Sequence, residues 1–158
     1  MLTRIRTLFQ SIAAALLIAA VFLNFANVIG RYVFGRPIVT TEEILQYMDV
    51  WIVMLTAAAV TAQNAHLRMD MLSPTSWPRI YRAQEVAIAL LGLGVAIFVC
   101  TQGLRIVSAT WDVGQRSVAA NIPLAFIYFA IPVGFACMAL FLARRIFLLL
   151  RGGPIEEG

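Results

Sequence analysis

Three carboxylates lie at the start of a strongly apolar run. They are Glu42, Glu43 and Asp49, in the segment TTEEILQYMDVWI. Carboxylates in such a place could relay protons, start a helix or bind another chain. Thr40 lies three residues before Glu43, which is the spacing of a capping box, and carboxylates in a first helical turn are stabilised by the exposed amides. We therefore predict a helix that begins near Thr40, with Glu43 as its capping residue.

Asp49 continues this polar feature toward the apolar run. Glu42, Gln46 and Asp49 follow one another at i, i+4 and i+7, which places them on one face of a helix. Since the uninterrupted apolar run begins at Val50, we place Asp49 at or just inside the membrane interface, where an ionisable group indicates a function or a partner. Arg31, before the second span, is one candidate partner for Asp49. The alternative is a solvated carboxylate without a partner.

A second polar cluster occupies the segment NAHLRMD, residues 64–70. Its His66, Arg68 and Asp70 alternate with apolar residues, as in an extended or turning segment. Two interpretations stay open. The segment is either a junction in which these side chains contact one another or a partner chain, or a plain polar loop.

The pattern does not favour catalysis or cofactor binding. His66 is the single histidine, whereas haem-binding helix bundles generally use two axial histidines. The sequence contains no HExxH motif, no nucleophile elbow and no cluster of metal ligands. We therefore expect no enzyme activity, no cofactor and no metal.

Four long apolar stretches separate and position these polar residues. The chain has 158 residues, of which 61% are hydrophobic and only 13% are charged. The stretches cover residues 8–30, 44–63, 86–105 and 122–144, and each is close to the ~20 residues that a helix needs to cross a bilayer. The sequence predicts an all-α integral membrane protein with four transmembrane helices and a short helical entry before the second. We expect a single membrane domain over residues 1–158, with a flexible tail over residues 151–158.

The basic residues indicate the orientation of the chain, and all twelve are arginines. Eight lie in the N-terminal tail, the loop over residues 63–85 and the C-terminal tail: Arg4, Arg6, Arg68, Arg79, Arg82, Arg144, Arg145 and Arg151. The other two loops hold Arg31, Arg36, Arg105 and Arg116. Since cytoplasmic loops carry an excess of positive charge, we expect both termini in the cytoplasm. The net charge of +4 then reflects topology, and no nucleic-acid partner is expected.

The order of several motifs resembles a known family. The segments GRYVFGRPIVTTEEILQYMDVWIVML, NAHLRMD and SVAANIPLAFIYFAIPVGFACMALFLARRI are similar to those of the small membrane subunit of tripartite ATP-independent periplasmic (TRAP) transporters. The matching residues are Arg31 and Tyr32, Glu42 and Glu43, Trp51, His66 with Asp70, and the run from Ile131 to Gly134 that contains Pro132. Asn64 and Thr56 stand where the family commonly has glycine. Asp49 stands where an apolar residue is expected, so the resemblance assigns it no role.

The resemblance implies a non-catalytic scaffold in the bacterial inner membrane. Its partners would be a large multi-span transport subunit, which carries the substrate and sodium sites, and a periplasmic protein that captures an organic acid. Glu42, Glu43 and Arg31 would order or contact partners on the periplasmic side. His66, Arg68 and Asp70 would do so on the cytoplasmic side. Pro132 would bend the last helix or loosen one backbone hydrogen bond, because its ring prevents a normal helical bond.

Two alternatives come from other functional classes. One is a self-sufficient, homodimeric, proton-coupled exporter that uses Asp49 as its proton site. The other is a haem-bearing anchor of a respiratory enzyme, which the single histidine disfavours.

Overall fold

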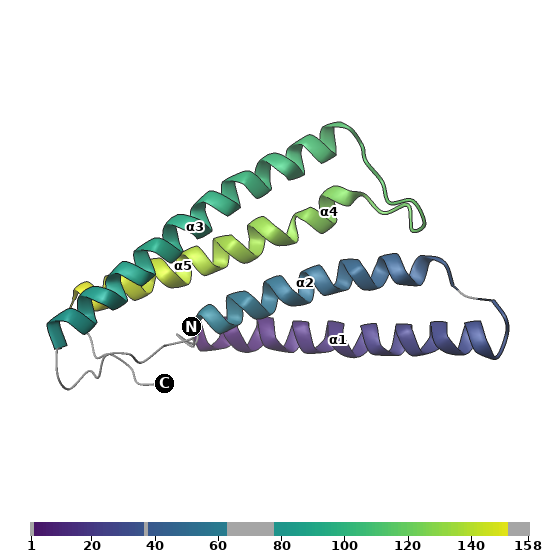
Figure 1. The fold of residues 1–158 in the computed structure, drawn as a ribbon, viewed down its shortest axis with the longest axis horizontal. Coiled ribbons are helices and arrows are strands. Elements are labelled where there is room, and N and C mark those ends of the chain that lie inside the picture. The colour runs from purple at the N-terminus through teal and green to yellow at the C-terminus, as the bar shows by residue number, and fades with distance from the viewer. Residues whose placement is uncertain (1, 37, 63–77, 152–158) are drawn as a thin grey trace.

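The structure of the chain, a computed structural model, describes residues 2–36, 38–62 and 78–151 (Figure 1). The helices are α1 (Leu2–Tyr32), α2 (Thr40–Ala62), α3 (Pro78–Asp112), α4 (Leu124–Tyr128) and α5 (Ala130–Leu150). Four segments are long and apolar enough to cross a membrane, and α4 and α5 together form the last of them. The predicted all-α fold with four transmembrane helices is confirmed.

The helices extend beyond the apolar stretches in the sequence. The third span was predicted over residues 86–105, whereas α3 runs over residues 78–112. A helix satisfies its backbone hydrogen bonds internally, so it can continue through polar residues at the membrane surface. Helix α2 begins at Thr40, where the sequence placed a helix start. Residue 63 of the second predicted span and residues 152–158 of the predicted tail lie outside the described part of the chain.

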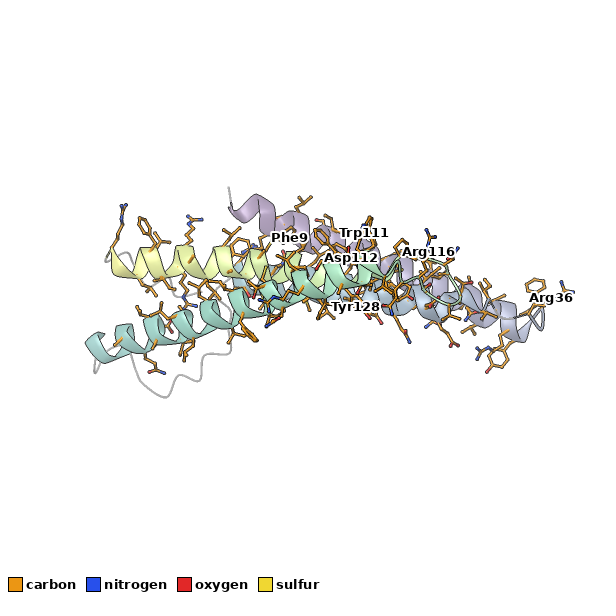
Figure 2. All side chains as sticks on the ribbon, turned by 90° about the horizontal axis from the view of Figure 1, so that it is seen from above. Phe9, Arg36, Trp111, Asp112, Arg116 and Tyr128 are labelled. Atoms are coloured by element: carbon orange, nitrogen blue, oxygen red, sulfur yellow. The ribbon has the colours of Figure 1, made fainter. Side chains whose placement is uncertain are left out.

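The helices form a single layer rather than a closed bundle (Figure 1). Their order across the layer is α1, α2, α5 and α3, because α1 packs on α2, α2 on α5, and α5 on α3. Residues 33–36 and 113–123 connect helices at one end of the layer, which we call the loop end. The first turn of α1 and the last turn of α5 lie at the opposite, terminal end. Arg36 and Arg116 mark the loop end when the layer is seen from above (Figure 2).

A layer of this kind leaves most of its apolar surface uncovered. Phe22 on α1 is 69% exposed and Leu91 on α3 is 72% exposed. A water-soluble chain with such a surface would aggregate, whereas lipid is as apolar as these side chains. The exposed apolar surface is therefore expected to contact lipid or another membrane protein.

Glycine allows the central helices to approach closely. A Cβ atom on Gly134 of α5 would lie 3.0 Å from Cβ and 3.3 Å from the carbonyl oxygen of Met54 on α2. Similarly, a Cβ atom on Gly103 of α3 would lie 3.1 Å from Cδ of Pro132. Lipid does not drive helices together, so association depends on such close contacts between small residues and neighbouring backbones.

The backbone of the last membrane span stays helical where α4 passes into α5. Phe129 separates the two helices, with φ −63° and ψ −22°. Pro132 has no N–H, and its ring occupies the space near the carbonyl group four residues earlier, which belongs to Tyr128. The boundary between α4 and α5 thus lies within one turn of the proline, where one helical hydrogen bond is missing.

Candidate functional site

The most extensive polar contact joins α2 to the loop before α4. The Glu43 carboxylate accepts hydrogen bonds from Oγ of Ser117 at 2.9 Å and from the backbone N–H groups of Val118, Ala119 and Ala120 at 3.1, 3.0 and 2.7 Å. Successive N–H groups that converge in this way form a concave anion-binding nest. Here the anion is a side chain of the same protein, so Glu43 anchors the loop to α2.

The loop over residues 113–123 is folded so that these N–H groups can converge. Gly114 and Asn121 adopt left-handed conformations, with φ +64° and +54°. Ser117 donates its backbone N–H to the Ile122 carbonyl oxygen at 2.9 Å, and Leu124 donates to Gln115 at 3.1 Å. The loop thus closes on itself like a short hairpin.

This geometry corrects the role that the capping-box spacing predicted for Glu43. The prediction required its carboxylate to turn back toward the N–H of Thr40. Instead the two carboxylate oxygens face the loop, where Ser117 and three backbone N–H groups are available. The loop offers four donors, whereas the capping box would offer the Glu43 side chain only the N–H of Thr40, so the loop contact is favoured.

The connection between α1 and α2 has its own polar contacts. Arg31, at the end of α1, forms an ion pair with Glu42 at 3.2 Å, and the two side chains are 49% and 72% exposed. Asn27 is buried, and its Oδ1 accepts a hydrogen bond from the Ile38 N–H at 2.9 Å. These contacts hold the start of α2 against α1.

The pairing of Arg31 also excludes it as the partner of Asp49. Arg31 pairs with Glu42 and not with Asp49, so the candidate pair suggested by the sequence is wrong. Asp49 is exposed on α2, and among the described residues it has no hydrogen-bond or ion-pair partner. Glu42 lies about two helical turns before Asp49, in the first turn of α2, and it is the carboxylate that pairs with the Arg31 guanidinium.

Aromatic and proline contacts extend the same interface into the layer. Trp51 on α2 packs against Phe126 of α4, with ring centroids 5.7 Å apart and tilted by 39°. Together with Glu43, it ties α2 to α4 and the preceding loop. Pro132 lies against α3, where Sγ of Cys100 donates a weak hydrogen bond to its carbonyl oxygen at 3.5 Å. Tyr32 is 79% exposed at the end of α1 and takes no part in this interface.

An ion pair that the sequence analysis missed joins α3 to α5. Arg145 donates a hydrogen bond to the Glu85 carboxylate, and the two side chains are only 14% and 11% exposed. Sequence reasoning treated Arg145 only as a topological charge. The sequence did contain a signal for this pair. Glu85 is an acidic residue at the start of the third apolar stretch, and Arg144 and Arg145 follow the fourth, so an ion pair between these two spans could have been predicted.

The remaining predicted site residues lie elsewhere. His66, Arg68 and Asp70 fall outside the described residues. Within the described ranges no group of three or more His, Cys, Asp or Glu side chains could hold a metal ion. The polar groups in the described residues can hold helices and loops in position, and they can present charge to a partner.

Comparison with known proteins points in one direction. The family model for the DctQ component of tripartite ATP-independent periplasmic transporters matches residues 20–152. The chain is 27% identical to the ectoine TRAP transporter small permease protein TeaB of Halomonas elongata, and the similarity covers 83% of this chain and 70% of that protein. It is also 29% identical to a Haemophilus influenzae protein named "Putative TRAP transporter small permease protein", with coverage of 72% and 68%.

Proposed function

The chain belongs to the DctQ family, the small permease component of TRAP transporters, and we propose that it acts there as a fixed scaffold that braces the large transport subunit. It is a transporter subunit and not an enzyme, and its four apolar helices make it a multi-pass protein of the inner membrane. Members of the family work with a large membrane subunit and a periplasmic binding protein.

The observation that best supports a scaffold role is that polar contacts hold the helices of this open layer together. Glu43 fixes the loop before α4 to α2, and the Glu85–Arg145 pair fixes α3 to α5. The first contact joins a helix to the loop of its neighbour and the second joins two neighbouring helices, so both resist sliding within the layer. A part that must stay still while another subunit moves needs such contacts, together with a wide uncovered face.

We further propose that both termini are cytoplasmic and that the loop end faces the periplasm. The excess of arginines on the terminal side of the chain supports this orientation. In that orientation the anchored loop over residues 113–123 is available to the periplasmic binding protein. A reporter enzyme fused after residue 158 tests the orientation, and a periplasmic signal there would contradict it.

The transport reaction itself is proposed from the family resemblance. We infer a secondary transporter that is driven by a sodium gradient and takes up an organic acid, with the substrate and ion sites on the large subunit. Membership of the family also favours this role over the self-sufficient exporter, in which Asp49 would be the proton site.

Purification from a membrane that contains the whole system tests the scaffold role. We would tag this chain, express it together with the large subunit and the binding protein, and extract the complex in mild detergent. The large subunit should co-purify in a fixed ratio, and sodium-driven uptake in vesicles should require both membrane subunits. Uptake by the large subunit and binding protein alone would contradict the proposal.

A further inference from the structure

One side of α2 carries every exposed residue of that helix. These residues are Glu42, Gln46, Asp49, Val53, Thr56 and Val60, and the other residues of Thr40–Ala62 are buried or half-buried. At about 100° of rotation per residue, all six fall in one narrow strip along the helix. We call this set the α2 strip. The contacts of α1 and α5 on either side of α2 explain its narrow width.

The spacing of the α2 strip is that of a helix–helix seam. Its members are separated alternately by four and three residues, which is the heptad spacing of positions that insert between the side chains of a neighbouring helix. Helices that pack through such a seam cross at about 20°. The strip therefore has the shape needed to receive one more membrane helix.

The chemistry of the strip shows that lipid is a poor occupant. Four of its members are polar or charged, namely Glu42, Gln46, Asp49 and Thr56. Asp49 lies about 14 Å along the axis from Thr40, at a rise of about 1.5 Å per residue. The uninterrupted apolar run begins at the next residue, Val50, so the carboxylate lies at or just inside the membrane interface. An exposed carboxylate at such a position is costly in hydrocarbon and generally faces protein or water.

A second copy of this chain is also a poor occupant. Two copies in the same membrane orientation, related by a two-fold axis through this strip, would place Asp49 opposite the Asp49 of the partner copy. Like charges in a medium of low dielectric repel each other. Arg31 cannot relieve this repulsion while it pairs with Glu42. The occupant must therefore be a different chain with complementary charge.

We propose that the α2 strip binds a transmembrane helix of the large transport subunit, and that Asp49 faces an arginine, a lysine or another hydrogen-bond donor on that helix. This inference rests on the proposed scaffold function and identifies the surface that performs it. It also gives Asp49 a role: the carboxylate sets which helix is bound and in which register.

Site-specific photo-cross-linking in the intact complex tests the location. A photoreactive phenylalanine analogue would replace Val53 or Val60 in the strip. Control positions are Phe22 on α1 and Leu91 on α3, which are also apolar and are more exposed than Val53 and Val60. We expect the strip positions to cross-link to the large subunit. Cross-links to a second copy, or to the large subunit from the control positions alone, would overturn the inference.

Charge substitutions test the chemistry. Asp49→Lys should lower recovery of the large subunit by about tenfold or more, with a smaller loss for Asp49→Asn, because an amide keeps part of the hydrogen bonding. Thr101→Lys, at an exposed polar position on α3, is the control and should leave recovery unchanged. Unchanged recovery with Asp49→Lys would overturn the inference.

These results are separable from the fate of the scaffold function. If the large subunit co-purifies but cross-links only from α1 or α3, the scaffold function stands and the α2 strip is excluded. If the unmodified chain does not bind the large subunit at all, the scaffold function itself fails. Gel filtration of each variant identifies one that has misfolded, in which case the cross-linking at Val53, with Asp49 intact, decides.

Discussion

The Glu43 carboxylate accepts a hydrogen bond from the Ala120 backbone N–H at 2.7 Å, although 77 positions separate the two residues in the sequence. Glu43 stands in the first turn of α2, and Ala120 lies in the loop that leads into the last membrane span. The contact therefore joins the α1–α2 helix pair to the pair formed by α3 and α5, at the loop end of the layer. Glu43 thus holds that loop against α2, together with the packing of Trp51 on Phe126.

Replacing Glu43 with glutamine should release the loop. The amide keeps one acceptor oxygen but places an NH2 group beside N–H donors, so several of the four hydrogen bonds are lost. We expect a cysteine introduced at Ala119 to react severalfold faster with a water-soluble maleimide in Glu43→Gln than in the parent. Glu42→Gln, which leaves the anchor intact, is the control, and an equal rate in both variants would contradict the role of Glu43.

Replacing Gly134 with alanine should push α2 and α5 apart. The new Cβ would meet both the side chain and the backbone of Met54, and the backbone cannot give way locally. We expect a loss of about 1–3 kcal/mol in the free energy of unfolding, measured by denaturant titration in detergent. Gly94→Ala is the matched control, because a Cβ there meets nothing within 4 Å. Equal stability of the two variants would exclude close packing at Gly134.

Breaking the Glu85–Arg145 pair should be far more damaging than breaking the Arg31–Glu42 pair. The first pair is nearly buried, so Glu85→Ala would leave an unpaired charge at a cost of about 3–5 kcal/mol. The second pair is exposed, and Glu42→Ala should cost no more than about 1 kcal/mol. Thermal unfolding of the two variants in detergent measures the difference. Comparable losses would show that water reaches the α3–α5 pair freely.

Replacing Asn27 with alanine should loosen the turn between α1 and α2. Without the buried amide oxygen of Asn27, the Ile38 N–H would lose its acceptor. We expect a loss of about 1 kcal/mol in the free energy of unfolding. Asn24→Ala is the control on the same helix, because Asn24 is exposed. Hydrogen exchange of the Ile38 amide gives the direct measurement. Unchanged protection in Asn27→Ala would rule out this hydrogen bond.

Several features could be predicted from the sequence because they depend on local chemistry. The length of each apolar stretch determined that there are four membrane spans, and the polar residues around Thr40 determined where α2 begins. The order of the motifs identified the family. Pro132 lies within one turn of the boundary between α4 and α5, and its missing N–H is a local property that can be read from the sequence.

Other features were decided only by the tertiary structure. An apolar side chain that faces lipid looks the same in sequence as one that faces another helix, so the order α1, α2, α5, α3 could not be predicted. For the same reason the Glu85–Arg145 pair was missed. The partner of a charged side chain depends on which distant donors the fold brings near. Glu43 therefore binds a distant loop rather than the end of its own helix. Arg31 forms its ion pair with Glu42, and Asp49 is exposed on α2.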